Sequence, residues 1–216
     1  MKRFVAIAGN IGAGKSALTA LLSERLGWEP FFEAVNDNPY LADFYADMQR
    51  WSFHSQIFFL SRRLNHHWQL LQRANSVVQD RTVYEDAEIF ACNLCRQGLM
   101  DKRDYHSYRE LYEVVITVLP PPDLIVYLRA SLPTLQERIH RRGRSYEREI
   151  SATYLKQLNE LYEEWIGGFS LCPVLSLPSD DLDFVLNHEH LELITNRVLE
   201  KLQGREEIVF EDNGRT

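Results

Sequence analysis

Short runs of apolar residues alternate along the chain with longer segments in which apolar residues recur every three or four positions. The short runs predict strands buried on both faces, because a half-exposed strand would alternate apolar with polar residues. The longer segments have the spacing of helices that turn one apolar face inward. The predicted strands are Phe4–Ala8, Ser76–Gln79, Leu124–Leu128 and Val174–Leu177, with Glu29–Glu33 as a weaker candidate. The predicted helices are 15–26, 38–48, 51–73, 86–96, 104–118, 131–142, 151–166 and 187–203.

This alternation of strands and helices favours an α/β fold, in which a parallel sheet is covered by helices on both sides. A chain of 216 residues fits one domain, and no repeat, low-complexity tract or Gly/Ser linker divides it. We therefore expect a single domain over residues 1–204. Residues 205–216 are polar and acidic, and we expect a mobile tail there.

Composition narrows the class of partner. The formal net charge of −7 argues against nucleic acid or a membrane surface as the main partner. No run of eighteen apolar residues is present, and the apolar N-terminal run stops at Gly9, too early for a secretion signal. An odd number of cysteines, three, fits a reducing cytoplasm better than a disulfide framework. Cys92 and Cys95 lack a second Cys/His pair at zinc-site distance, so we interpret them as structural residues on one helix face.

The first predicted strand runs into a phosphate-binding motif. The pattern G-x-x-x-x-G-K-[ST] is met in full, and a helical segment follows it. In such a loop glycines let backbone N–H groups point at phosphate oxygens, and the helix presents its positive end to the same anion. Lys15 is expected to reach the β- and γ-phosphates, and Ser16 to hold Mg²⁺. The alternative is a glycine-rich turn with a chance lysine. The motif residues are Gly9, Asn10, Ile11, Gly12, Ala13, Gly14, Lys15 and Ser16.

A basic segment, Arg138–Arg144, narrows the choice among nucleotide-binding proteins. The D-x-x-G and N-K-x-D strings of GTPases are absent, which leaves families that use ATP. Arg138 and Arg142 share one helical face, and Gly143 lets the chain bend into a closing lid. Guanidinium groups brought onto a transferring phosphoryl group stabilise its negative charge, as in small-molecule kinases. The alternative is a solvated basic helix face.

Taken in order, several segments resemble the deoxynucleoside kinases, over residues 3 to about 185. The resemblance implies a P-loop kinase fold, with a five-stranded parallel sheet flanked by helices and an arginine-rich lid. It also implies ATP- and Mg²⁺-dependent phosphorylation of a deoxynucleoside 5′-hydroxyl. It further implies a homodimer formed through the long helices after residues 51 and 86. The segments are the phosphate loop, Phe32–Val35, Arg50–Gln56, Asp80–Asp86 and Arg138–Glu147.

The resemblance suggests which residues carry the chemistry. Glu33 follows the predicted second strand, where α/β folds place ligands, and a carboxylate there can accept the proton of the 5′-hydroxyl. The family regards its glutamate at this point as the base. Asp80-Arg81-Thr82 stands where the family has an acidic-Arg-Ser motif. Asp80 is expected to bind Mg²⁺ directly or through water, and Arg81 to steady the 5′-oxygen and the phosphate.

A second group of residues resembles the family's base-binding set. Gln56 and Arg63 lie seven positions apart, hence on one helix face, and an amide can pair with a base edge. Arg63 and Asp86 resemble the arginine–aspartate pair beside the base, with Arg62 as the competing arginine. Phe90 follows one helical turn after Asp86 and is expected to stack on the base, although a lone aromatic is more often part of a core.

The resemblance also covers the sugar and the donor nucleotide. Tyr45 and Glu147 resemble the pair that hydrogen-bonds the sugar 3′-hydroxyl. Residues Asp180–Phe184 take the place of the loop that contacts adenine through its main chain. The family's lid arginines match Arg138, Arg142 and Arg144, which leaves Arg141 facing outward.

Asp86 carries the substrate prediction. In the family an acidic residue here goes with deoxyadenosine, deoxyguanosine or deoxycytidine, and Asn36–Tyr40 resembles the short bacterial deoxyadenosine/deoxyguanosine kinases. A purine deoxynucleoside is therefore expected, with deoxycytidine left open. One alternative is a nucleoside-monophosphate kinase of the thymidylate type, although Glu33 would repel the acceptor's phosphate. Another is a non-catalytic nucleotide-binding subunit, but Lys15 and Arg81 are both present.

Overall fold

The computed structural model describes residues 2–32, 38–144, 147 and 150–204. Two predictions fall outside these ranges: the base role of Glu33 and the tail at 205–216.

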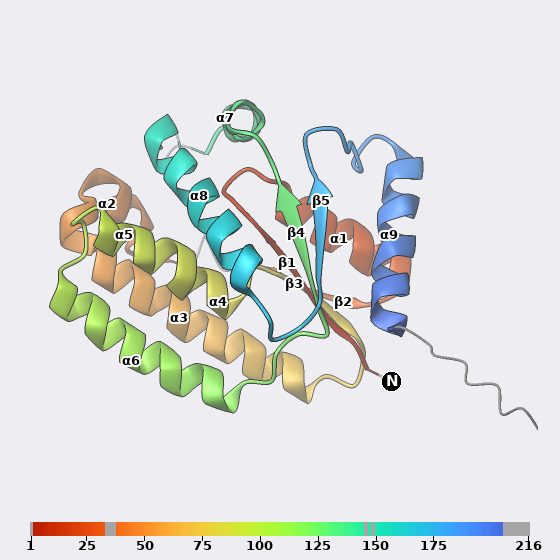
Figure 1. The fold of residues 1–216 in the computed structure, drawn as a ribbon, viewed down its shortest axis with the longest axis horizontal. Helices are drawn as coiled ribbons and strands as arrows, with labels where there is room; N and C mark the ends of the chain where they lie inside the picture. Colours follow the sequence, from red (N-terminus) through yellow and green to blue (C-terminus); the bar gives the residue numbers. More distant parts are fainter. Residues whose placement is uncertain (1, 33–37, 145–146, 148–149, 205–216) are drawn as a thin grey trace, which may run out of the picture.

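Five parallel strands form one sheet in the order β2-β3-β1-β4-β5 (Figure 1). The predicted α/β fold with a five-stranded parallel sheet is confirmed. In its register Ile7 pairs with Asp80 and Gly9 pairs with Leu128, so the ends of β3 and β4 flank the start of the phosphate loop. The strands are β1 (Phe4–Gly9), β2 (Glu29–Phe31), β3 (Val77–Asp80), β4 (Leu124–Arg129) and β5 (Val174–Pro178).

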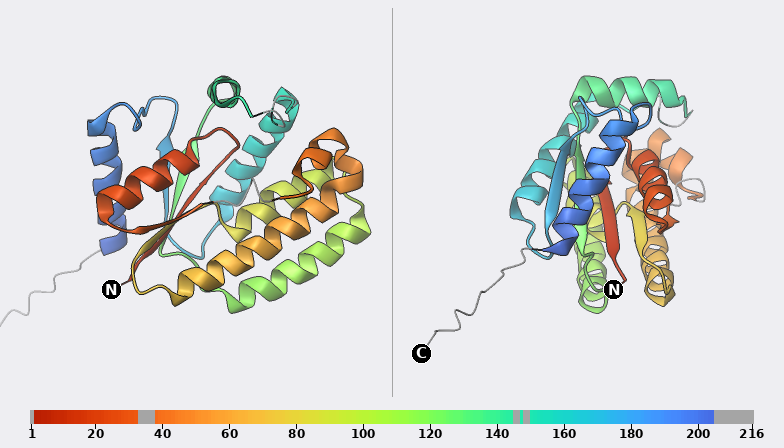
Figure 2. Two further views of the ribbon diagram at one scale, coloured as in Figure 1. Left: turned by 180° about the vertical axis from the view of Figure 1, so that it is seen from behind. Right: turned by 90° about the vertical axis from the view of Figure 1, so that its right-hand side faces the viewer.

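Helices cover both faces of this sheet, and α7 crosses above the carboxyl ends of its strands (Figure 2). Most of their bounds lie within one or two residues of the predicted ones. The helices are α1 (Lys15–Leu26), α2 (Leu41–Ala46), α3 (Met48–Gln72), α4 (Val83–Glu85), the π-helical η2 (Asp86–Ala91), α5 (Cys92–Arg96), α6 (Lys102–Val118), α7 (Leu132–Arg142), α8 (Ala152–Gly168) and α9 (His188–Gln203).

The alternation of side chains along the strands divides the core. In β1, Val5 and Ile7 pack in the cluster that includes residues of α1, α7 and α9. Ala6 and Ala8 face the opposite cluster, which includes residues of α3, η2 and α8. Because every residue of β1 is buried, the strand reads as a continuous apolar run.

Local capping explains two differences from the predicted helices. The helix after β3 starts at Val83 rather than at residue 86, because the Thr82 side chain accepts from the Glu85 backbone while the Glu85 side chain accepts from the Thr82 backbone. Asp47 separates α2 from α3 in a non-helical conformation, with φ −147° and ψ 82°, and its carboxylate accepts from Arg50 N. The second long helix therefore begins at Met48 instead of residue 51.

Candidate functional site

A cavity of about 760 Å³ opens at the carboxyl end of the sheet. Walls from the phosphate loop, β3, α2, α3, η2, α7 and the segment after β5 enclose it. Arg63 is absent from the lining, although its partner Asp86 is present. The predicted site residues that line the cavity are Ile11, Gly12, Gly14, Lys15, Ser16, Tyr45, Gln56, Asp80, Arg81, Asp86, Phe90, Arg138, Arg142, Arg144 and Glu147.

The phosphate loop has the backbone that its glycines permit. Gly9, Gly12 and Gly14 all have positive φ values, a region that side chains with a Cβ rarely adopt. A Cβ on Gly12 would lie 2.9 Å from Leu135 O and 2.9 Å from Ile139 Cγ1, both in α7. The loop therefore needs glycine at position 12 for both its backbone angle and its contact with the lid helix.

Lys15 is buried beneath this loop. Its Nζ donates to Asn10 O at 2.9 Å, so the ammonium lies inside the curve of the loop. The Asn10 side chain donates in turn to Leu155 O and to Asn159 Oδ1 of α8, at 2.9 and 2.7 Å. The Asn10 side chain thus ties the phosphate loop to α8.

Ser16 and Asp80 fit a magnesium ion. The Ser16 hydroxyl donates to Asp80 Oδ2 at 2.5 Å, which brings a hydroxyl and a carboxylate oxygen to one point of the cavity wall. Mg²⁺ prefers such hard oxygens and takes few protein ligands, because it keeps waters and substrate phosphate oxygens in its shell. Within the described ranges no cluster of three or more His, Cys, Asp or Glu forms a dedicated metal cage.

The predicted ion pair between Arg63 and Asp86 is present. Arg63 Nε lies 3.2 Å from Asp86 Oδ2, and Nη2 lies 3.5 Å from Oδ1. Both side chains are almost fully buried, at 3% and 4% exposure. Arg63 Nη1 also donates to the carbonyls of Asp80 and Arg81, so this arginine ties α3 to the end of β3. Arg62, the competing candidate, is exposed and stacks over Phe58.

Arg81 has the one positive φ among the described residues other than glycine, at 69°. Its N–H donates to Ile7 O at 2.9 Å, and its carbonyl accepts from Gln79 Nε2 at 2.7 Å. The guanidinium lies 4.5 Å above the ring of Phe90, the residue predicted to stack on the base. Phe90 lines the cavity. Its ring therefore contacts the Arg81 guanidinium and is also the surface on which the base is predicted to stack.

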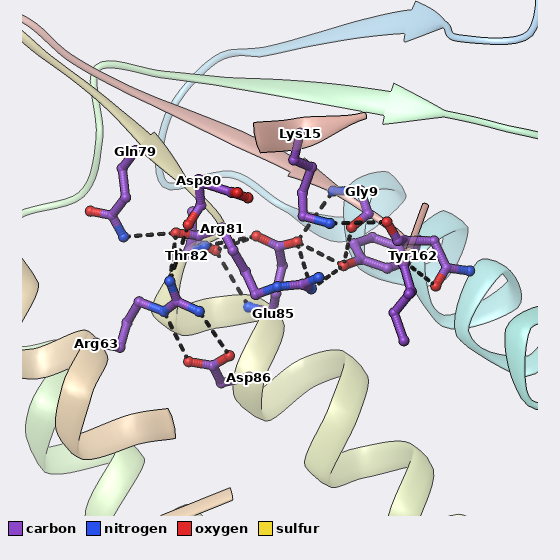
Figure 3. Close-up of polar contacts among 12 residues, drawn as sticks. Gly9, Lys15, Arg63, Gln79, Asp80, Arg81, Thr82, Glu85, Asp86 and Tyr162 are labelled. Atoms are coloured by element: carbon purple, nitrogen blue, oxygen red, sulfur yellow. Dashed lines mark hydrogen bonds and ion pairs between the residues drawn. The ribbon is translucent and has the colours of Figure 1, made fainter. Parts of the chain in front are cut away.

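Glu85 and Tyr162, for which no role was predicted, connect Arg81 to the phosphate loop. Figure 3 shows both of them between Arg81 and the phosphate loop. Glu85 Oε1 accepts from Gly9 N at 3.2 Å, from Arg81 Nη1 at 3.3 Å and from the Tyr162 hydroxyl at 2.7 Å. The T-x-x-E spacing of Thr82 and Glu85 is a capping-box signal that could have marked this glutamate, but nothing in the pattern pointed to Tyr162.

The lid arginines make two different sets of contacts. Arg138 donates to Ala13 O at 3.0 Å and to both Ser179 oxygens, and so lies against the phosphate loop. Arg142 and Arg144 both donate to the buried carboxylate of Glu147, at 2.6 and 3.3 Å. Arg141, which was predicted to face outward, lines the cavity instead.

The fold and this site define a P-loop kinase: a phosphate loop follows the first strand of a parallel sheet, and an arginine-bearing lid helix packs beside that loop and lines the same cavity. The model of the deoxynucleoside kinase family matches residues 5–203, and the chain belongs to that family. The match confirms the predicted family and enzyme class, a phosphotransferase, over both alternatives. Across the described ranges no helix combines the length and the apolar character needed to cross a membrane.

Individual relatives are similar over most of the chain. A deoxyadenosine/deoxycytidine kinase of Bacillus subtilis (strain 168) is 40% identical over 90% of this chain and 90% of its own length. A deoxyguanosine kinase of the same organism is 37% identical over 91% and 96%. Among solved structures, a deoxyadenosine kinase from M. mycoides with the products dCMP and a flexible dCDP bound has a TM-score of 0.81. It is 35% identical, and the match covers 91% of this chain and 99% of that one.

Proposed function

We propose that this protein transfers the γ-phosphate of ATP to the 5′-hydroxyl of a purine deoxynucleoside, deoxyadenosine or deoxyguanosine, in deoxynucleotide salvage. Deoxycytidine remains a candidate acceptor. One observation carries the proposal. A single cavity is lined both by Lys15 and Ser16 of the phosphate loop and by Gln56, Asp86 and Phe90, the residues predicted to bind the base. The names of the relatives, which include kinases for deoxyadenosine and deoxyguanosine, support the purine preference.

The donor end of the cavity suits a nucleoside triphosphate. The Lys15 ammonium and the loop N–H groups would bind the phosphates, together with the lid residues Arg138, Arg142 and Arg144, which line the same cavity. Ser16 and Asp80 would hold Mg²⁺, which when bound neutralises charge on the phosphate oxygens.

The acceptor end suits a deoxynucleoside. Asp86, held by Arg63, presents acceptor oxygens, and Gln56 offers both a donor and an acceptor to the edge of a base. Tyr45 and Glu147 also line the cavity and would bind the sugar 3′-hydroxyl. A purine would stack on Phe90.

For the transfer itself, we assign Glu33 as the base and Arg81 as the group that steadies the 5′-oxygen and the phosphate. The 5′-oxygen forms a bond to the γ-phosphorus while the bond to the bridging β–γ oxygen breaks, and the hydroxyl proton passes to the Glu33 carboxylate. Positive charge at Arg81 and Lys15 stabilises the charge that spreads over the transferring group.

We further propose that the protein is a cytoplasmic homodimer with neither nucleic acid nor membrane as partner. Along α6, Leu111, Val114 and Val118 recur with helical spacing, and the last two are 64% and 67% exposed. Trp68 of the neighbouring α3 is 61% exposed. A monomer rarely leaves such an apolar face in water, and a second copy would cover it. Val114→Glu is expected to shift the protein from dimer to monomer in analytical ultracentrifugation; an unchanged dimer would place the interface elsewhere.

The activity is tested with a substrate panel. With ATP and Mg²⁺, deoxyadenosine or deoxyguanosine should be phosphorylated faster than thymidine, and deoxyadenosine monophosphate should not be an acceptor. Glu33→Gln should lower kcat by about 10²- to 10⁴-fold, the range typical of a lost general base. Glu29→Gln is the matched control, because the Glu29 side chain accepts from Asn75 and pairs with Arg73, and Glu29 is not among the residues that line the cavity. Equal rates for Glu33→Gln and Glu29→Gln would refute the base assignment, and turnover of monophosphates alone would refute the function.

A further inference from the structure

A buried cluster links Arg81 to the phosphate loop. Glu85 is completely buried, and its two carboxylate oxygens accept from groups of several elements. Oε1 accepts hydrogen bonds from Gly9 N, Arg81 Nη1 and the Tyr162 hydroxyl. Oε2 accepts hydrogen bonds from the N–H and the hydroxyl of Thr82, at 2.8 and 3.2 Å. Every one of these groups is a donor, so both oxygens of the Glu85 side chain act as hydrogen-bond acceptors.

The Tyr162 hydroxyl completes the cluster from α8. It accepts from Arg81 Nη1 at 2.8 Å and lies 2.7 Å from Glu85 Oε1 and 2.8 Å from Gly9 O. Burial raises the pKa of Tyr162 well above its ordinary value, so the hydroxyl keeps its proton and remains a donor. Its ring stacks on Tyr127 at 5.7 Å with an angle of 16° between the planes, which fixes the direction of the hydroxyl.

The Arg81 backbone has an unfavourable conformation, and its side chain is held by contacts on more than one side. Its backbone is held in the left-handed region at φ 69°, and its guanidinium has contacts from the cluster on one side and the Phe90 ring at 4.5 Å. Gly9 is the first residue of the phosphate loop, so one carboxylate contacts both the loop and the arginine. Phosphoryl transfer depends on the relative positions of such groups, because a displacement of about 1 Å can cost about 10²-fold in rate.

We infer that Glu85 and Tyr162 are positioning residues, which fix the Arg81 guanidinium relative to the phosphate loop for phosphoryl transfer. The inference rests on the proposed function, in which Arg81 contacts the transferring phosphate. Neither residue lines the cavity, so both act through Arg81 and Gly9 rather than on a ligand.

Tyr162→Phe tests the inference, because it removes the hydroxyl and keeps the stacked ring. With deoxyadenosine, ATP and Mg²⁺, kcat should fall about tenfold, as for one lost hydrogen bond to a charged group, while both KM values change less than about twofold. Tyr127→Phe is the matched control: it removes the hydroxyl of the stacking partner, which donates to Glu163 instead. The control should keep kcat within about twofold of the wild type.

A double-mutant cycle with Arg81→Lys separates positioning from general structural damage. If Tyr162 acts through the guanidinium, Tyr162→Phe should cause little further loss in kcat once Arg81 is lysine. Independent, multiplying losses would overturn the inference, as would a Tyr162→Phe kcat equal to that of Tyr127→Phe. Full activity in Arg81→Lys would overturn both the inference and the role proposed for Arg81, whereas an inactive wild type would overturn the proposed function itself. If Tyr162→Phe melts far below the control, Glu85→Gln takes its place in the same cycle and should show the same selective loss in kcat.

Discussion

The buried pair of Arg63 and Asp86 allows a quantitative prediction. Asp86→Ala removes one partner and leaves the guanidinium buried, at 3% exposure, without its carboxylate. Breaking a buried pair in this way typically costs about 3–5 kcal/mol. Arg63 keeps its hydrogen bonds to the carbonyls of Asp80 and Arg81, so we expect the lower end, about 3 kcal/mol. For a chain of this size, that corresponds to a melting temperature lower by about 6–12 °C.

Differential scanning calorimetry measures the change, and the exposed pair of Arg96 and Glu164 provides the control. Those side chains are 54% and 59% exposed with 3.0 Å between their charged atoms, so Glu164→Ala should cost less than about 1 kcal/mol. The double variant Arg63→Met/Asp86→Ala removes both charges. Its loss in free energy of unfolding should be smaller than the sum of the losses of the two single variants. If Asp86→Ala cost no more than Glu164→Ala, the reasoning about a desolvated pair would be wrong.

Two further predictions use a glycine and a histidine. Gly12→Ala should lower kcat/KM for ATP at least about tenfold, because the added Cβ would lie 2.9 Å from atoms of α7. Gly27→Ala is the control: a Cβ there meets nothing within 4 Å, but φ is +66°, so the variant should lose about 1–2 kcal/mol of stability and keep its activity. Comparable activity in the two variants would contradict the steric argument. Burial lowers the pKa of His67 from 6.5 to about 4, so the unfolded chain binds more protons between these values and stability should fall by about 2 kcal/mol from pH 7 to pH 5. Denaturant titrations of His67→Leu should show that much less pH dependence; an unchanged slope would exclude His67 as its source.

The helix bounds show which parts of the fold are determined by residues near them in the sequence. The start of α1 at Lys15 and its end at Leu26 agree with prediction, because the phosphate motif fixes the first residue and Gly27 ends the helix in a left-handed conformation. The start of α4 depends on the reciprocal hydrogen bonds of Thr82 and Glu85, which the apolar spacing does not record. Strand order likewise cannot be read from spacing, since it depends on which strands pair across the sheet.

The candidate site divides in the same way. Lys15 was predicted from the phosphate-loop motif, and Gln56 and Asp86 from the family resemblance; the structure places all three on one cavity. Tyr162 was missed because its contact with Glu85 joins positions 77 residues apart. Buried polar groups satisfied across such separations show no local signal in a single sequence.

The contact between α7 and the phosphate loop limits how the entrance to the cavity can open. Leu135 O and Ile139 lie against Gly12, and Arg138 donates to Ala13 O, so the first two turns of α7 share a rigid base with the loop. A rotation of the whole helix would break these contacts, whereas a bend at Gly143 leaves them intact. The φ of Gly143, +69°, lies in the left-handed region that favours glycine. Nucleotide entry and product release are therefore expected to move Arg144, while Arg138 stays in place.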